Sequence, residues 1–277
     1  MLSTRHTNST NEVSRMNTEE LRANFLIEDL GQDNEINFVY SHYDRVMIGV
    51  AKPTFQGLEL PNYESLKANF FLERRELGII NVGGEGSVLA DGKNYAVAKL
   101  GCVYLGKNTQ NVAFSSQDAA HPAVFFLLSL PAHRDYPNRQ FTKEDASPVA
   151  LGAVETCNKR TIYKYIHNDG IQSCQLVMGL TVLEVGSIWN TMPAHVHDRR
   201  MEAYFYFDVQ ENQAVFHLMG QPQETRHLVV KNHEAIISPP WSVHSGAGTM
   251  NYSFIWGMAG ENKDFTDMDF VAVKDLK

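Results

Sequence analysis

The chain has little cysteine, no excess of positive charge and no long hydrophobic run. Its three cysteines, Cys102, Cys157 and Cys174, are odd in number, and their spacing fits neither a disulfide framework nor a zinc ribbon. We therefore expect buried free thiols in a reducing compartment. The net charge of −8 argues against nucleic acid as a partner, although a local basic pocket could still bind a small anion.

Segments that would carry the chain to a membrane are also lacking. No run approaches the roughly 18 apolar residues of a membrane span. The polar N-terminus has no apolar core of the kind that a signal peptide needs. We expect a cytoplasmic protein without a membrane partner. The hydrophobic content of 43% supplies core for one large domain or two small ones.

Short apolar segments separated by turn residues fill most of the sequence. Asp91 and Gly92 form a hairpin signal between two such segments. Near the N-terminus, Asn17 and Glu20 occupy the positions of a capping box, which predicts a short helix with Leu21 on its apolar face. Evenly spaced short strands predict an all-β fold, either a barrel or a sandwich.

A change of composition divides the strands into two series. Residues 131–150 contain three prolines and many charges, which indicate a long connection. We predict an N-terminal arm with a short helix over residues 1–30 and a first barrel over residues 31–130. A connection over residues 131–160 leads to a second barrel over residues 161–277.

The two series contain a weak internal repeat. Residues 72–80 resemble residues 197–205, which aligns Leu72 with His197 and Leu77 with Glu202. A second pair of segments aligns Asn111 with His244. The first barrel is therefore predicted to be a copy of the second that lacks its polar residues.

Those polar residues form a metal-binding pattern. His195 and His197 lie two residues apart, so in a strand both side chains point to one face. Glu202 follows five residues later, and His244 follows a Pro-Pro turn. A lone His-x-His pair is weak evidence, but the full set is specific, and it suits Zn, Fe(II), Mn, Ni or Co. Catalytic zinc often has only three protein ligands, so the metal could be catalytic or structural.

The pattern resembles the paired motif of the cupin superfamily, in which a glycine precedes His-x-His and a glutamate, and a Pro-containing turn precedes the last histidine. Gly186 opens the first motif here. Trp241 stands where a turn glycine is usual, and Gly248 stands where an asparagine is usual. These departures leave all four ligand positions intact.

Longer blocks resemble the family of 5-keto-4-deoxyuronate isomerases, from about Leu21 to the C-terminus. The blocks are residues 71–78, 189–193, 199–202, 220–227, 254–258 and 267–276. The resemblance implies a bicupin fold, a homohexamer, and one Zn²⁺ per subunit bound by His195, His197, Glu202 and His244. It also implies conversion of 5-dehydro-4-deoxy-D-glucuronate to 3-deoxy-D-glycero-2,5-hexodiulosonate, an aldose–ketose isomerisation in the catabolism of pectin-type uronates.

Such a reaction needs a base that moves a proton between two carbons and an electrophile that stabilises the enediolate oxygen. The sequence does not identify which residue is the base. The open candidates are Tyr204, Tyr206, Lys164 and His227. For the substrate carboxylate, arginine is the natural bidentate partner, and the candidates are Arg160, Arg199, Arg200 and Arg226. We interpret His217 as a structural histidine within a strand.

Two other functions fit part of the pattern. The same ligand set could hold a redox metal in a cupin dioxygenase. A non-catalytic sugar-binding bicupin is the second alternative, but the complete ligand set in one half argues against it.

Overall fold

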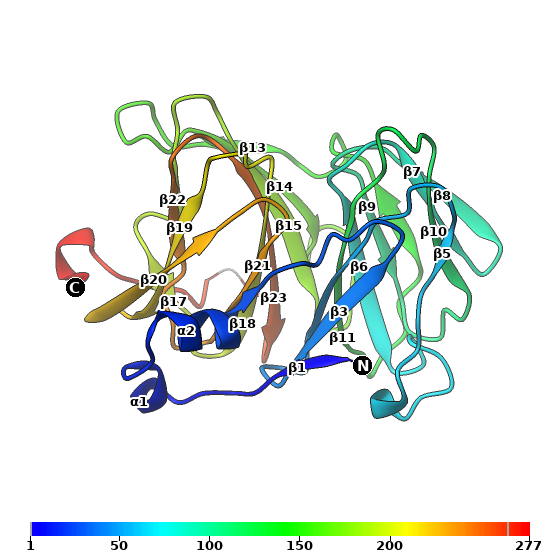
Figure 1. The fold of residues 1–277 in the computed structure, drawn as a ribbon, viewed down its shortest axis with the longest axis horizontal. Coiled ribbons are helices and arrows are strands. Elements are labelled where there is room, and N and C mark those ends of the chain that lie inside the picture. Colours follow the sequence, from blue (N-terminus) through cyan, green and yellow to red (C-terminus); the bar gives the residue numbers. More distant parts are fainter. Residues whose placement is uncertain (1, 265) are drawn as a thin grey trace. The chain divides into compact units, whose positions relative to one another are not determined.

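Strands dominate the computed structural model, which describes residues 2–264 and 266–277 (Figure 1). The all-β prediction is thereby confirmed. The chain forms two compact units, and each unit is made of three segments that alternate along the sequence. Unit 1 comprises residues 2–4, Asp29–Ser147 and Lys164–Met178, and unit 2 comprises Arg5–Glu28, Pro148–Tyr163 and Gly179–Lys277.

Unit 1 is built from a seven-stranded and a four-stranded sheet. The larger has the order β1–β3–β4–β11–β6–β9–β12, with bounds Ser3–Arg5, Ile36–Ser41, Met47–Ala51, Phe125–Pro131, Arg75–Asn81, Cys102–Leu105 and Arg139–Phe141. The smaller has the order β5–β10–β7–β8, with bounds Leu58–Glu59, Val112–Ser116, Gly86–Ala90 and Lys93–Val97. A short 3-10 helix, η1, spans Glu64–Leu66.

The core of unit 1 lies between these sheets and is apolar. Leu77 and Leu127 from the larger sheet join Val88 and Phe114 from the smaller one in a single buried cluster. The predicted Asp91-Gly92 hairpin joins β7 to β8, and both residues have the positive φ that such a turn requires.

Unit 2 repeats this plan. Its larger sheet has the order β13–β14–β15–β23–β18–β21–β2, with bounds Val149–Leu151, Arg160–Ile166, Val177–Leu183, Ser253–Gly260, Arg200–Phe207, Ala235–Ser238 and Leu26–Ile27. Its smaller sheet has the order β16–β22–β19–β20, with bounds Trp189–Asn190, Ser245–Gly248, Val215–Gln221 and Glu224–Val230. A separate two-stranded sheet pairs β17 (His195–Val196) with β24 (Asp269–Phe270).

The N-terminal segment belongs largely to unit 2. Helix α1 (Thr10–Val13) contacts β19, and helix α2 (Thr18–Phe25) contacts β20 and β21 (Figure 1). The capping box of Asn17 and Glu20 is confirmed, and Leu21 is buried. A last 3-10 helix, η2, spans Val273–Asp275. None of the described helices is long and apolar enough to cross a membrane.

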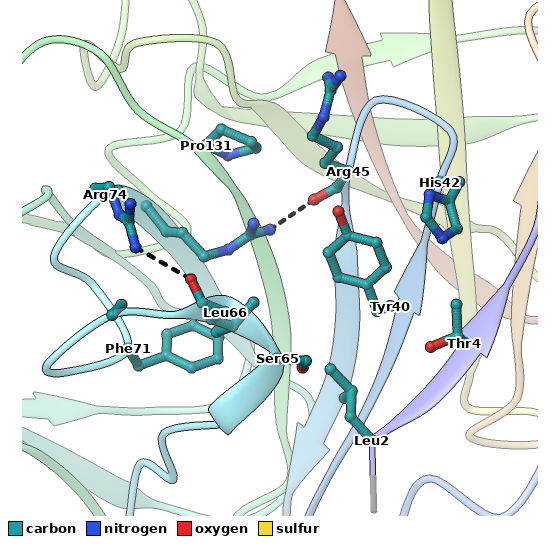
Figure 2. Close-up of a pocket in the computed structure, with 12 residues that line it drawn as sticks. Leu2, Thr4, Tyr40, His42, Arg45, Ser65, Leu66, Phe71, Arg74 and Pro131 are labelled. Atoms are coloured by element: carbon teal, nitrogen blue, oxygen red, sulfur yellow. Dashed lines mark hydrogen bonds between the residues drawn. The ribbon is translucent and has the colours of Figure 1, made fainter.

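The strand register confirms the internal repeat. In unit 1, Leu77 of β6 pairs with Ser129 on one side and Leu105 on the other. In unit 2, Glu202 of β18 pairs with Met258 and Ser238 in the same arrangement. Leu77 therefore occupies the position of Glu202, as the sequence alignment predicts. A cavity of about 450 Å³ opens in unit 1 (Figure 2).

Candidate metal centre

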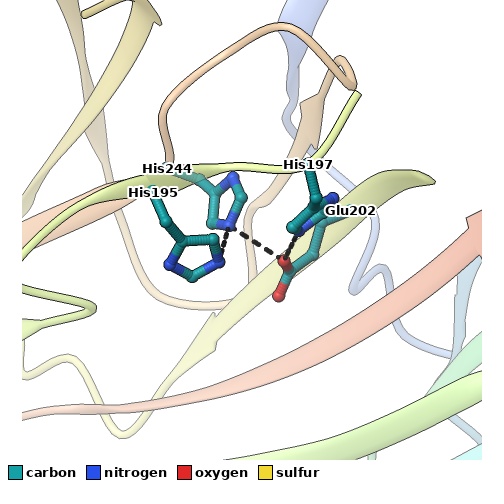
Figure 3. A group of neighbouring side chains, drawn as sticks. All are labelled: His195, His197, Glu202 and His244. Carbon is teal, nitrogen blue, oxygen red and sulfur yellow. Dashed lines mark hydrogen bonds and ion pairs between the residues drawn. The ribbon is translucent and has the colours of Figure 1, made fainter. Parts of the chain in front are cut away.

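Four polar side chains of unit 2 converge, although they come from three segments of the chain. His195 begins β17, His197 follows it, Glu202 lies in β18, and His244 directly precedes β22. One donor atom from each residue lies within 4.8 Å of the others (Figure 3). Glu202 Oε2 is 3.2 Å from His197 Nε2 and 3.1 Å from His244 Nε2. His195 Nε2 is 2.9 Å from His244 Nε2.

Hydrogen bonds from the far side of two rings orient these nitrogens. His197 Nδ1 lies 2.8 Å from the Arg200 carbonyl oxygen, which can only accept, so the imidazole proton sits on Nδ1. His244 Nδ1 likewise faces the Ser242 carbonyl oxygen at 3.3 Å. Both rings therefore turn an Nε2 lone pair towards the centre of the group, the arrangement that outer hydrogen bonds impose on metal-binding histidines.

Burial favours the neutral form of two of the three imidazoles. Burial lowers the pKa of His195 to about 4. Burial also lowers the pKa of His244 well below its usual value, and the neighbouring His195 adds to this effect. For His197, burial lowers the pKa, but the hydrogen bond with Glu202 and the charge of Glu202 together outweigh it, and the net shift is upward. Three imidazoles and a carboxylate in a buried group make a donor set that fits a divalent cation.

An ion pair fixes the turn between the ligands. The fully buried Arg200 donates from Nε to Asp267 at 3.2 Å, and its Nη2 forms a second, short contact with the same carboxylate. Burial raises the pKa of Asp267, but the hydrogen bonds from Arg200 and Asn262, together with the charge of Arg200, produce a net decrease. β24 pairs with β17 close by, and the Phe270 ring lies 5.7 Å from the His195 ring. The C-terminal segment thus braces the loop that carries His195 and His197.

The inward face of β18 continues from Glu202 to two tyrosines, because alternate residues share a face. The Tyr204 ring is 5.7 Å from that of His244, and its hydroxyl lies 3.4 Å from Thr191 Oγ1. Tyr206 lies farther along the strand, and its hydroxyl is 2.7 Å from His217 Nδ1. Burial raises the pKa of both phenols well above the usual value, so both are protonated.

Two buried polar atoms beside this face have no hydrogen-bond partner in the described residues. They are His217 Nε2 and Asn190 Oδ1. The amide of Asn190 donates to the Tyr252 hydroxyl at 2.8 Å. A buried polar atom without a partner costs about 1–3 kcal/mol. The pair therefore marks a place where a water molecule or a ligand would complete the hydrogen bonds.

Sequence analysis did not assign a functional role to His217 or Asn190. The alternation of β19 could have indicated a buried polar residue. Val215, His217 and Met219 all point inward, and of these three only His217 is polar. Burial lowers its pKa to about 3, so the ring is neutral. Gly246 lies opposite: a Cβ there would approach Asn190 Nδ2 to 2.8 Å and the Tyr206 hydroxyl to 3.3 Å. Glycine at this position thus makes room for the polar cluster.

The arginine candidates other than Arg200 have partners away from the four-residue group. Arg226 donates to the carbonyl oxygens of Val13, Ser14 and Met16 and so anchors the segment after α1. Arg160 donates to the Asn158 carbonyl oxygen. Arg199 is exposed, with its Nε 3.8 Å from Glu261.

The remaining candidates lie on outer surfaces or in the other unit. His227 is exposed on β20, where its ring packs 6.0 Å from that of Phe216. Lys164 is half-buried in β14, at the residue where the chain passes from unit 2 to unit 1. Of the proton-transfer candidates, Tyr204 and Tyr206 are the two that lie beside the four-residue group.

Comparison with known proteins identifies the family of the chain. Residues 25–273 match the KduI/IolB family. The chain belongs to this family. It is 53% identical over 273 residues to the 4-deoxy-L-threo-5-hexosulose-uronate ketol-isomerase of Halalkalibacterium halodurans, covering 99% of each chain. It is 55% identical over 260 residues to the enzyme of the same name from Shouchella clausii, covering 94% of each chain.

More distant likenesses concern the fold alone. An IolB-like protein from Salmonella typhimurium superposes with a TM-score of 0.73 at 16% identity, covering 90% of this chain and 97% of that one. Oxalate decarboxylase from Lactobacillus farciminis gives a TM-score of 0.58 at 10% identity, covering 90% and 86%. With the duplicated barrels described above, these likenesses confirm the predicted bicupin fold.

Proposed function

We propose that this protein is a ketol-isomerase that converts 5-dehydro-4-deoxy-D-glucuronate to 3-deoxy-D-glycero-2,5-hexodiulosonate. The observation that carries the proposal is the buried cluster of His195, His197, Glu202 and His244 in a chain more than half identical to relatives bearing the ketol-isomerase name. In this reaction a proton moves from C2 to C1, and the C1 aldehyde and C2 hydroxyl become a C1 hydroxyl and a C2 ketone.

We propose Zn²⁺ as the cofactor, one per subunit, held by these four residues. The fit rests on the donor set: two imidazoles of lowered pKa, a third whose Nδ1 proton is held by the Arg200 carbonyl oxygen, and one carboxylate. A divalent cation here would supply Lewis acidity, which polarises neighbouring substrate oxygens.

The chain's own residues would bind and orient the substrate at the polar cluster beside the ligands. Because the Tyr206 phenol stays protonated, its hydroxyl can donate to His217 Nδ1, which lies 2.7 Å away. The remaining proton of His217 is then on Nε2, which becomes a donor. Asn190 Oδ1 is an acceptor. A donor beside an acceptor suits the carbonyl and hydroxyl groups that the reaction exchanges.

Tyr204 is placed to connect this cluster to the metal ligands. Its hydroxyl lies 3.4 Å from Thr191 Oγ1, and burial together with the nearby charge of Glu202 raises its pKa. Because both tyrosines stay protonated, we propose that Tyr206 uses its proton to hold His217 and that the two rings exclude water. Tyr206 would act with His217 as a positioning pair.

The wider setting of the proposal comes from the family resemblance. We propose a homohexamer that works in the cytoplasm in the catabolism of pectin-derived uronates. The small-molecule substrate is a keto-deoxyuronate, whose carboxylate calls for a cationic partner. We propose Arg160, Arg199 and Arg226 for that role. Each of them would have to exchange the partner described above for the substrate carboxylate.

The test is a product assay by NMR under anaerobic conditions, with the keto-deoxyuronate as substrate. We expect isomerisation without oxygen consumption, loss of turnover on chelation, and recovery when zinc is added. Asn111→Ala, at the unit 1 position aligned with His244, is the matched control for His244→Ala. Activity that requires oxygen and iron would replace the isomerase proposal with the dioxygenase alternative. Binding of the sugar acid without turnover would favour a sugar-binding bicupin.

A further inference from the structure

The internal repeat aligns two buried arginines that differ in their partners. Arg75 of β6 corresponds to Arg200 of β18, since each lies two residues before the aligned pair Leu77 and Glu202. Both contact the same position of the neighbouring strand: Arg75 Nε donates to Ser129 Oγ at 3.0 Å, and Arg200 Nη1 lies 3.0 Å from the Met258 sulfur.

Arg200 has a carboxylate partner, whereas Arg75 does not. Arg200 is neutralised by Asp267. Arg75 donates from Nη2 to the carbonyl oxygens of Arg45 and Ser129, and within the described part of the chain no carboxylate forms an ion pair with it. Its exposed fraction is 7%, and although burial lowers its pKa to about 10, the side chain is cationic at neutral pH. A buried charge is normally paired.

The nearest carboxylate in sequence, Glu76, is already occupied. It is fully buried and accepts hydrogen bonds from the Tyr104 hydroxyl and from the backbone N–H groups of Cys174, Gln175 and Leu176. Adjacent strand residues face opposite sides, so Glu76 forms no ion pair with Arg75, although its charge raises the pKa of Arg75.

In place of a carboxylate, a cavity adjoins Arg75. Its volume is about 450 Å³, and Arg45 and Arg74 also line it (Figure 2). Tyr40, Leu66 and Phe71 supply ring and aliphatic walls. None of the described residues that line it is acidic. Arg74 is held by the Leu66 carbonyl oxygen, and the Arg45 guanidinium has no ion pair in the described residues.

We propose that unit 1 binds a small carboxylate-bearing molecule in this cavity, with Arg75 as its buried anchor. The repeat favours a carboxylate, because that is the group that unit 2 supplies to the aligned arginine through Asp267. The cavity volume lies in the range of small-ligand sites, and an apolar wall with a few convergent charges is their usual lining. Arginine is the side chain whose planar fork matches a carboxylate in two parallel hydrogen bonds.

The test is isothermal titration of the full chain with D-glucuronate, inorganic phosphate and D-glucose. We expect D-glucuronate to bind and D-glucose, which has no charge, not to bind. Arg45→Glu places a carboxylate at the cavity and should weaken D-glucuronate binding at least about tenfold. Arg139→Glu, which reverses an exposed charge of unit 1 outside the cavity, should leave binding unchanged.

Several outcomes would overturn this proposal. Equal affinity in Arg45→Glu and Arg139→Glu would place the binding elsewhere. Phosphate binding without D-glucuronate binding would contradict the carboxylate assignment. If neither anion bound and Arg45→Glu altered the oligomeric state in size-exclusion chromatography, the cavity would be a contact between copies of the chain. Binding should persist in His244→Ala, so a failure of the proposed catalytic role would leave this result intact.

Discussion

The two barrels share a strand order and differ in what their central strand carries. The inward face of β6 presents Leu77 and Ile79 to an apolar core. The aligned face of β18 presents Glu202 and Tyr204 to three histidines. Unit 1 shows that the architecture does not depend on these polar residues. Burying them in unit 2 costs free energy that metal and substrate binding would offset.

The two aligned buried arginines also differ in what they contact. Arg200 holds the turn between His197 and Glu202 because its own carbonyl accepts from His197 and its side chain binds Asp267. In unit 1 the aligned Arg75 adjoins a cavity. One position of the repeat thus holds the turn between two of the proposed metal ligands in one barrel and is the proposed anion anchor in the other.

We expect the largest effect when a glutamate is placed in unit 1 at the position aligned with Glu202. Leu77→Glu would bury a charge that has no partner in the unit 1 core, where Leu77 is completely buried. We expect a loss of about 3–5 kcal/mol in the free energy of unfolding, measured by urea denaturation. Leu77→Met, which keeps the volume and the apolar character, should cost less than about 1.5 kcal/mol. Equal effects of the two variants would contradict an apolar role for this position.

The reciprocal change, Glu202→Leu, should abolish activity while the metal-free protein stays folded. Removing the only carboxylate of the cluster should lower kcat by about a thousandfold, since a Lewis acid contributes several kcal/mol. Metal content by mass spectrometry and turnover by NMR check this. Asn111→Ala, at the aligned position of His244 in unit 1, should leave both values unchanged. Full turnover of Glu202→Leu with its metal absent would assign the metal a structural role.

We expect a smaller effect when the ion pair between Arg200 and Asp267 is removed. Asp267→Asn keeps the shape of the side chain but removes the charge that Arg200 binds. We expect a 10–100-fold loss of zinc affinity, the usual effect of changing an outer partner of metal ligands. A chelator competition assay measures it. Asp269→Asn, an exposed residue of β24, is the control. Unchanged affinity in Asp267→Asn would mean that the turn holds its shape without the ion pair.

The smallest effect concerns His217 and its dependence on pH. Its pKa is about 3 in the folded chain and about 6.5 in the unfolded chain, so only the unfolded chain takes up a proton as the pH falls through this window. Stability from this group is therefore complete above pH 6.5 and declines by up to about 1.4 kcal/mol per pH unit below it. His217→Gln should show a shallower decline in urea denaturation between pH 7 and pH 5. Identical slopes would contradict a neutral buried His217.

The sequence predicted the parts of this molecule that depend on local spacing. The capping box of Asn17 and Glu20 and the Asp91-Gly92 hairpin depend on neighbouring residues, and both are confirmed. The four clustered residues were also predictable, because His195, His197 and Glu202 lie within one short segment and His244 follows a distinctive turn. Periodic short strands were sufficient for the all-β class.

Contacts between distant segments could not be predicted in this way. Arg200 and Asp267 are 67 residues apart, and Glu76 accepts from N–H groups about a hundred residues later. The pairing of β2 with β21, which draws the N-terminal segment into unit 2, has no local signal either. The role proposed for His217 depends on an unpartnered ring nitrogen, which only the three-dimensional structure reveals.

We propose that one metal ion in unit 2 supports isomerisation. The most direct measurement is a zinc titration of the metal-free protein, with isomerisation followed anaerobically by NMR at each step. We predict that activity rises linearly, stops rising at one zinc per chain, and stays absent in Glu202→Leu. Activity that is already complete before any metal is added, or that rises equally in Glu202→Leu, would contradict the account.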